Sequence, residues 1–208
     1  MQIDNKLSEL ARKYRTNKVD HNYTPFYERL FFDKKNTTNF LEIGISEGSS
    51  LLMWQDYFKN ATIFGLDLFI PPSVINQPRI KYDIADQSSV EQLELSIKKW
   101  STPEFDIIID DGGHTVKQQK TSLETLWKYV KTGGIYIVED LHTNIDHLHD
   151  IHPHLSSRRF HLDEYPTVHE KIIHTMTNDS LKFNLDGLTD ILYFSNPKTM
   201  SLTCALFK

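Results

Sequence analysis

The sequence predicts an α/β fold built on a mainly parallel sheet of seven strands. Three observations indicate this class: seven short apolar runs rich in β-branched and aromatic residues, helical patterns of about 8 to 15 residues in three of the intervals between them, and turn-forming residues at their ends. Strands that alternate with helices form right-handed βαβ units, in which the strands are parallel. We therefore expect a doubly wound sheet with helices on both faces.

The predicted elements follow one another without a linker or repeat. The predicted strands are 40–45, 62–67, 79–83, 105–110, 135–138, 191–194 and 202–207. The predicted helices are 51–58, 88–100 with Ser88 or Ser89 as N-cap, and 116–130 with Gly133 and Gly134 as its C-cap. Strand 105–110 is apolar on both faces, as in a buried central strand. The last two strands flank a turn sequence and are expected to form an antiparallel hairpin at one edge.

Composition excludes several classes of protein. The 208 residues include 28 acidic and 23 basic ones, giving a formal net charge of −5, so no basic surface is expected for nucleic acid. No apolar run reaches the roughly 20 residues of a membrane span, and the N-terminus is charged rather than signal-like. The single cysteine, Cys204, has no disulfide partner. We expect one cytoplasmic domain, 1–208, with a helical segment at 1–36 and a substrate lid at 144–180.

A glycine turn after the first strand predicts a cofactor site. In open α/β sheets, ligands bind at the carboxyl ends of the strands, and the Gly44-x-x-x-Gly48 turn lets backbone N–H groups approach an anion. Ser46 stands where a dinucleotide fingerprint needs glycine, which disfavours a pyrophosphate and favours a nucleoside bearing a carboxylate. Asp67 suits ribose hydroxyls, and residues 83–85 suit adenine. The predicted cofactor contacts are Glu42, Gly44, Gly48, Ser49, Asp67, Asp83, Ile84, Ala85 and Asp110. The alternative is that both glycines serve only the turn.

Carboxylates follow the fourth and fifth strands. Asp111 precedes Gly112-Gly113-His114, and Glu139-Asp140 ends the fifth strand. Convergent carboxylates repel one another unless a cation neutralises them, and oxygen ligands suit Mg²⁺ better than Zn²⁺. We expect Asp111 and Asp140 to be metal ligands and His114 to be a general base. The alternative is that these residues only cap strand ends.

Histidines crowd the segment after the fifth strand. Eight of the ten lie there: His142, His147, His149, His152, His154, His161, His169 and His174. The i,i+2 pairs among them do not match a helical zinc motif, which favours a polar lid over a metal site, although the sequence leaves both open. His142 lies nearest the acidic strand ends and is the expected substrate contact.

These motifs resemble a known family. Leu41-Glu42-Ile43-Gly44, Asp67, the segment 109–114 and the segment 133–143 are similar to those of class I S-adenosylmethionine-dependent O-methyltransferases of the macrolide-sugar type. The segment 14–18 and the following His21, Tyr23 and Tyr27-Glu28 also resemble that family, except that Arg15 and Asn17 replace Gly and Asp. The resemblance implies a Rossmann-like fold and Mg²⁺-dependent methylation of a sugar hydroxyl. It further implies Asp111 and Asp140 as metal ligands, His114 as base and Glu28 as a third ligand.

Two other functions remain open at this stage. A nicotinamide-dependent oxidoreductase shares the fold class, although Ser46 disfavours it, and a non-catalytic cofactor-binding protein would need no metal. For the methyltransferase hypothesis the cofactors are S-adenosylmethionine and Mg²⁺. The expected partner is a small sugar-containing substrate, without nucleic acid or membrane, and a homo-oligomer is compatible with the sequence.

Overall fold

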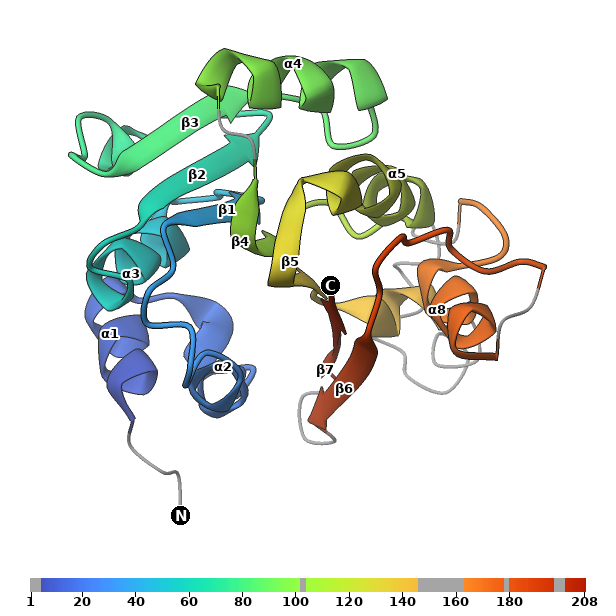
Figure 1. Cartoon of the computed structure of the whole chain (residues 1–208). Coiled ribbons are helices and arrows are strands. Elements are labelled where there is room, and N and C mark those ends of the chain that lie inside the picture. Colours follow the sequence, from blue (N-terminus) through green and yellow to red (C-terminus); the bar gives the residue numbers. More distant parts are fainter. Residues whose placement is uncertain (1–4, 102–103, 146–162, 178–179, 197–200) are drawn as a thin grey trace.

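The computed structural model describes residues 5–101, 104–145, 163–177, 180–196 and 201–208. Its centre is a seven-stranded sheet of order β3-β2-β1-β4-β5-β7-β6 (Figure 1). The strands are β1 (Asn39–Ile43), β2 (Thr62–Asp67), β3 (Ile80–Ile84), β4 (Phe105–Asp110), β5 (Val130–Val138), β6 (Asp190–Asn196) and β7 (Ser201–Phe207). Strands β1 to β5 pair in parallel, whereas β7 is antiparallel to both β5 and β6. The predicted fold class, including the C-terminal hairpin, is confirmed.

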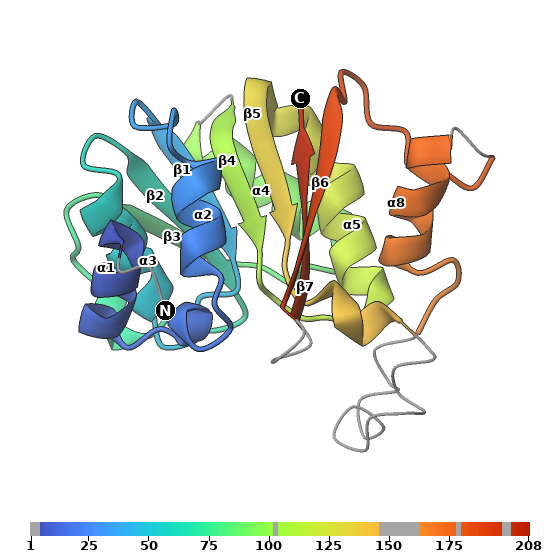
Figure 2. The same ribbon diagram turned by 90° about the horizontal axis from the view of Figure 1, so that it is seen from below.

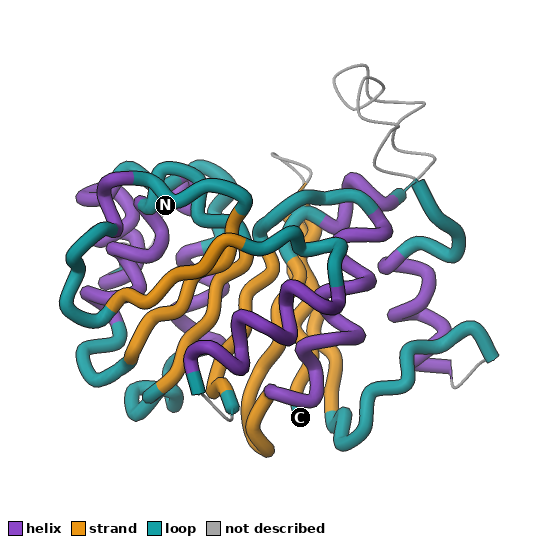
Figure 3. The backbone as a smooth tube through the Cα atoms, turned by 90° about the horizontal axis from the view of Figure 1, so that it is seen from above, coloured by secondary structure: helices purple, strands orange, loops and turns teal. Residues whose placement is uncertain are grey.

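Helices cover both faces of the sheet (Figures 2 and 3). The α-helices are α1 (Lys6–Tyr14), α2 (Thr24–Leu30), α3 (Ser49–Tyr57), α4 (Val90–Trp100), α5 (Val116–Leu126) and α8 (Val168–Thr177). Short 3₁₀ segments are η1 (Asn17–Val19), η2 (Pro72–Val74), η3 (Trp127–Tyr129) and η4 (Leu141–Asn144). Helices α1, α2 and α3 pack on one face, and α4, α5 and α8 pack on the other. None of the helices in the described ranges is both long and apolar enough to cross a membrane.

Alternation along the central strands produces two cores. In β4, Ile107 and Ile109 join the core of α1, α2 and α3, where Trp54 is fully buried. Ile108 points to the other face and packs in the core that contains Leu123 of α5. Successive side chains of a strand point to opposite faces, so a central strand that is apolar throughout supplies both layers.

One predicted boundary is wrong. Gly133 and Gly134 do not cap a helix, because α5 ends at Leu126 and both glycines lie inside β5. The pairing of β5 with β4 shifts between Val130 and Ile135, and Gly133 adopts a φ of +77°. Such a shift, with a glycine at positive φ, is typical of a bulge. Of the two predicted N-caps, Ser88 and Ser89, the one that caps α4 is Ser89, because its hydroxyl accepts a hydrogen bond from the Gln92 N–H.

Asp106 connects the amino ends of β1, β4 and β5 through its carboxylate. We therefore predict that Asp106→Asn lowers the free energy of unfolding by about 1–3 kcal/mol at pH 7. Its carboxylate accepts 2.9 Å hydrogen bonds from the N–H groups of Thr38 and Asn39 and lies 2.9 Å from Lys131 Nζ. Burial by itself raises the pKa of Asp106, but the bonds from Asn39, Lys131 and Thr38 together lower it below the usual value.

Because the folded-state pKa is depressed, this contribution is present above the unfolded pKa and is lost as the pH falls through the folded one. Urea unfolding of Asp106→Asn and wild type at pH 7 and about pH 3 should therefore give a difference that shrinks in acid. Asp33→Asn, at a side chain 77% exposed, is the matched control. An equal difference at both pH values would contradict the assignment.

Candidate active site

A cavity of about 560 Å³ opens at the carboxyl ends of the parallel strands. It lies where the strand order reverses between β1 and β4, the point at which open α/β sheets bind ligands. Seven of the residues predicted as site residues line it: Gly44, Ser49, Asp67, Ala85, Asp111, His114 and Asp140. The structure therefore brings the predicted cofactor turn and the predicted metal ligands to one cavity.

The turn after β1 is shaped by close backbone contact. Gly44 has a φ of +90°, and a Cβ added there would lie 2.1 Å from the backbone oxygen of Asp111, so only glycine fits. Asp67 Oδ2 accepts hydrogen bonds from the N–H groups of Ile45 (2.6 Å) and Ser46 (3.0 Å). Asp67 thus holds the turn in place while it lines the cavity.

The expected adenine contacts are only partly correct. Ala85 lines the cavity, but the Asp83 carboxylate is 2.7 Å from Lys99 Nζ on α4, and the Ile84 side chain is 63% exposed. Strand β3 ends at Ile84, one residue beyond the predicted strand 79–83. The first residue after this strand, Ala85, is therefore the one that lines the cavity. Asp86 takes part in the lining, as does Gln87, which the sequence interpretation did not select.

Three further predicted cofactor contacts are not among the residues that line the cavity. Glu42 is fully buried and accepts a 2.6 Å hydrogen bond from Ser50 Oγ. A Cβ at Gly48 would point at Ser73, in the segment η2. Asp110 is fully buried and accepts a 2.6 Å hydrogen bond from Gln87 Nε2, and burial raises its pKa to about 7. Glu42 and Asp110 hold residues that border the cavity.

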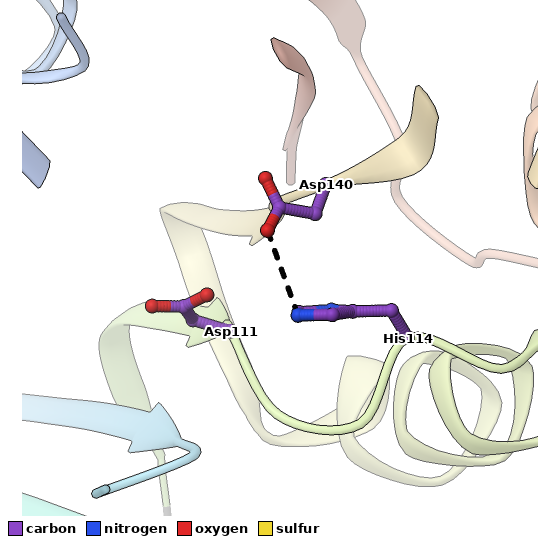
Figure 4. Close-up of side chains that lie close together, drawn as sticks. All are labelled: Asp111, His114 and Asp140. Atoms are coloured by element: carbon purple, nitrogen blue, oxygen red, sulfur yellow. Dashed lines mark ion pairs between the residues drawn. The ribbon is translucent and has the colours of Figure 1, made fainter. Parts of the chain in front are cut away.

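Asp111, His114 and Asp140 form a cluster that can hold a metal ion (Figure 4). One ligand atom from each lies within 4.8 Å of the others, and His114 Nε2 is 3.5 Å from Asp140 Oδ2. Asp140 directs its carboxylate from a left-handed backbone conformation, with φ +56°, which aspartate tolerates better than most residues. Burial alone raises the pKa of Asp140, but His114, His142 and the Tyr23 hydroxyl together lower it, which favours the carboxylate form.

Lys18 lies at the centre of the acidic residues, and the sequence interpretation gave it no role. Its Nζ is 2.7 Å from Asp111 Oδ2, 2.7 Å from Glu139 Oε1 and 3.3 Å from Glu42 Oε1, and the side chain is 1% exposed. Burial by itself lowers the pKa of Lys18, but these three carboxylates outweigh it and hold the pKa well above its usual range. Burial and the Asp111 charge raise the pKa of Glu139 well above normal.

Helix α2 faces the cluster with tyrosines rather than with the predicted glutamate. Tyr23 immediately precedes α2, and its hydroxyl donates a hydrogen bond to Asp140 Oδ1 at 2.7 Å. The Tyr27 hydroxyl, within α2, donates to Glu139 Oε1. Residues i and i+4 share a helix face, and Glu28 lies off that face. Its carboxylate instead accepts hydrogen bonds from Leu7 N (2.9 Å) and the Tyr57 hydroxyl (3.3 Å). Glu28 is therefore corrected from metal ligand to a residue that joins α1, α2 and α3.

His142 does not line the cavity either. It lies in η4, 6% exposed, with Nδ1 3.9 Å from Asp140 Oδ1, so it borders the Asp111–His114–Asp140 cluster. His147, His149, His152, His154 and His161 lie outside the described residues. The predicted lid at 144–180 is described mainly at 163–177, where α8 packs against α5.

Comparison with known proteins agrees with the fold. No model of a known protein family matches the chain. Mycinamicin VI 2''-O-methyltransferase of Micromonospora griseorubida is 37% identical over 147 residues, covering 66% of this chain and 36% of the relative. A tetracenomycin 3'-O-methyltransferase of Streptomyces olivaceus, whose name specifies a 2-methoxy-rhamnosyl group, is 35% identical over 147 residues, covering 66% and 37%.

Among solved structures, the MycE methyltransferase of the mycinamycin biosynthetic pathway, in complex with Mg, SAH and mycinamycin VI, superimposes with a TM-score of 0.74. It is 26% identical, and the match covers 100% of this chain and 56% of that one. The fold is thus Rossmann-like, with a cavity at its switch point. The resemblance to macrolide-sugar O-methyltransferases is confirmed. The chain spans about a third of the length of the curated relatives it matches.

Proposed function

We propose that this chain carries the methyl-transfer site of an S-adenosylmethionine-dependent, Mg²⁺-assisted O-methyltransferase. The acceptor proposed is a hydroxyl group of a sugar or a sugar-containing metabolite. The observation that carries the proposal is the position of the Asp111–His114–Asp140 cluster at the border of the same cavity as the Gly44 turn and Asp67. The names of the two relatives support the reaction class, and the rhamnosyl group in one name supports a sugar acceptor.

The cavity suits the cofactor in size and in chemistry. A volume of about 560 Å³ falls within the range of small-molecule sites, about 300–1,000 Å³. The turn from Gly44 to Ser49 would border the methionine part, Asp67 the ribose, and Ala85 with Gln87 the adenine. S-adenosylmethionine supplies an activated methyl group when it is bound there.

The donor set also suits Mg²⁺. Asp111 and Asp140 offer the carboxylate oxygens that this ion prefers, and the cluster carries more acidic groups than Lys18 balances. We propose that these two carboxylates hold the ion. When bound, Mg²⁺ orients an acceptor oxygen and lowers the pKa of its hydroxyl group.

The residues of the chain then supply alignment and proton transfer. His114 Nε2 would accept the acceptor hydroxyl proton, and Asp140, 3.5 Å away, would stabilise the imidazolium that forms. Lys18 and Tyr23 fix the carboxylates through 2.7 Å contacts, so little reorganisation is needed during the reaction. The turn from Gly44 to Ser49 and Asp67 would hold the cofactor, whose sulfonium would give its methyl group to the acceptor oxygen and keep the electron pair of the broken carbon–sulfur bond.

Titration calorimetry of S-adenosylhomocysteine into the chain, with chelator and then with Mg²⁺, tests this function. We expect micromolar binding of S-adenosylhomocysteine and none of NAD, because Ser46 replaces the glycine that a pyrophosphate needs. Asp140→Asn should weaken Mg²⁺ binding at least tenfold and leave S-adenosylhomocysteine binding within about twofold, since a ligand charge is lost away from the nucleoside. Asp20→Asn, at an exposed position, is the matched control. Failure to bind S-adenosylhomocysteine with or without metal would sink the proposal.

A further inference from the structure

Arg15 has an unusual backbone conformation for its residue type. It follows α1 with φ +59° and ψ +38°, and its N–H bonds to Arg12 O while the Thr16 N–H bonds to Ala11 O. This arrangement is a helix C-terminus at which glycine is strongly preferred, because a side chain there is strained. The local structure therefore gives no reason for arginine at this position, and any advantage must come from its side chain.

Arg15 itself borders the cavity. Arg15, Thr16 and Asn17 all contribute to the lining, although α1 lies far from the strand ends in sequence. Helix α1 packs against α3, which begins at Ser49 of the cofactor turn. Three residues later, Lys18 contacts Asp111 of the metal cluster. Arg15 therefore lies between a helix that packs on α3 and a lysine that contacts the acidic cluster.

The charge of the lining makes this cation distinctive. The acidic lining residues are Glu47, Asp67, Asp86, Asp111 and Asp140, whereas Arg15 is the one lysine or arginine among the described lining residues. Asp111 is paired with Lys18, and Asp67 with backbone N–H groups. Within the described ranges, the guanidinium of Arg15 makes no hydrogen bond or ion pair.

We propose that Arg15 forms the subsite for the α-carboxylate of the cofactor, an inference that rests on the proposed function. The methionine part of the cofactor combines a carboxylate with positive charges. An acidic cavity favours the positive charges but repels the carboxylate, so this group needs a local cation. A guanidinium binds a carboxylate through two parallel N–H···O bonds. Arg15 therefore offsets the repulsion that the acidic lining would otherwise exert on that end of the cofactor.

The test compares two ligands that differ in the carboxylate. S-adenosylhomocysteine carries the amino-acid group, whereas 5′-methylthioadenosine keeps the nucleoside and sulfur but lacks it. Arg15→Gly should weaken S-adenosylhomocysteine about 10- to 100-fold in calorimetry and leave 5′-methylthioadenosine within about twofold, as expected for one charge-assisted contact. Arg15→Lys should retain part of the affinity. Because glycine relieves the strained backbone, Arg15→Gly should unfold at the same temperature as wild type or higher.

Arg12→Ala is the matched control, because it removes the same charge from the same helix end at a residue that does not line the cavity. Arg12→Ala should change the affinity for neither ligand by more than about twofold. The salt dependence of its effect on binding should be smaller than that of Arg15→Gly. Unchanged S-adenosylhomocysteine binding in Arg15→Gly overturns the proposal, and so does an equal loss for both ligands. If wild type binds 5′-methylthioadenosine but not S-adenosylhomocysteine, the proposed carboxylate subsite is overturned, whereas the nucleoside site is not. If it binds neither, the proposed function fails first.

Discussion

Replacing Lys18 by methionine is expected to destabilise the folded chain by about 3–5 kcal/mol at neutral pH. Methionine matches the length of the lysine stem but carries no charge, so Asp111, Glu139 and Glu42 would keep their places around an apolar group. Removing one partner of a buried ion pair leaves the other charges unpaired at a site that water does not reach. The destabilisation would come mainly from Glu42 and Glu139, because both side chains are at most 2% exposed.

Urea unfolding at pH 7 measures this loss. Lys13→Met is the control, since the Lys13 side chain is 58% exposed and pairs with Asp56 at the surface, where water and salt weaken such a pair. A loss below about 1 kcal/mol for Lys18→Met would contradict the buried network. Saturating Mg²⁺ should restore part of the stability, because a bound cation neutralises the same carboxylates.

The fold was predictable because its signals are local and repeated. Strand 62–67 and strand 105–110 were predicted to the residue, since each is a short apolar run bounded by turn residues. Gly133 and Gly134 misled the prediction, because a glycine pair after a helical pattern is the usual sign of a C-cap. Only the pairing of β5 with β4 and β7 shows that these glycines continue a strand.

The site was predictable where the sheet alone determines it. Asp67 ends β2, Asp111 follows β4 and Asp140 comes shortly after β5. Their placement on parallel strands of one sheet brings them to one edge without knowledge of any side-chain contact. Lys18 and Tyr23 could not be found in this way, because they come from the helices before β1 and reach the site only after α1 and α2 pack on the sheet. The available signals were the family resemblance of the segment 14–18, which contains Lys18, and the spacing of Tyr23 and Tyr27, four apart on one helical face.

The largest effect on activity is expected from His114→Ala. Loss of a positioned general base lowers kcat by about 10²- to 10⁴-fold. The imidazole is 3.5 Å from Asp140 and borders the cavity, so its removal leaves the cofactor turn and Asp67 intact. S-adenosylhomocysteine affinity should therefore change by less than about twofold. Transfer of a labelled methyl group to a rhamnoside or macrolide glycoside that wild type methylates measures kcat, and calorimetry measures affinity.

Two further variants separate a base from a residue that merely supports the cluster. His174→Ala, on α8 and away from the cavity lining, should keep wild-type turnover. Asp140→Asn should lower kcat as well, but the double variant His114→Ala/Asp140→Asn should be little slower than the slower single variant. Residues that act as one unit in the transition state are non-additive in this way. A kcat within about threefold of wild type in His114→Ala would exclude it as the base, and fully additive losses would show that His114 and Asp140 act independently.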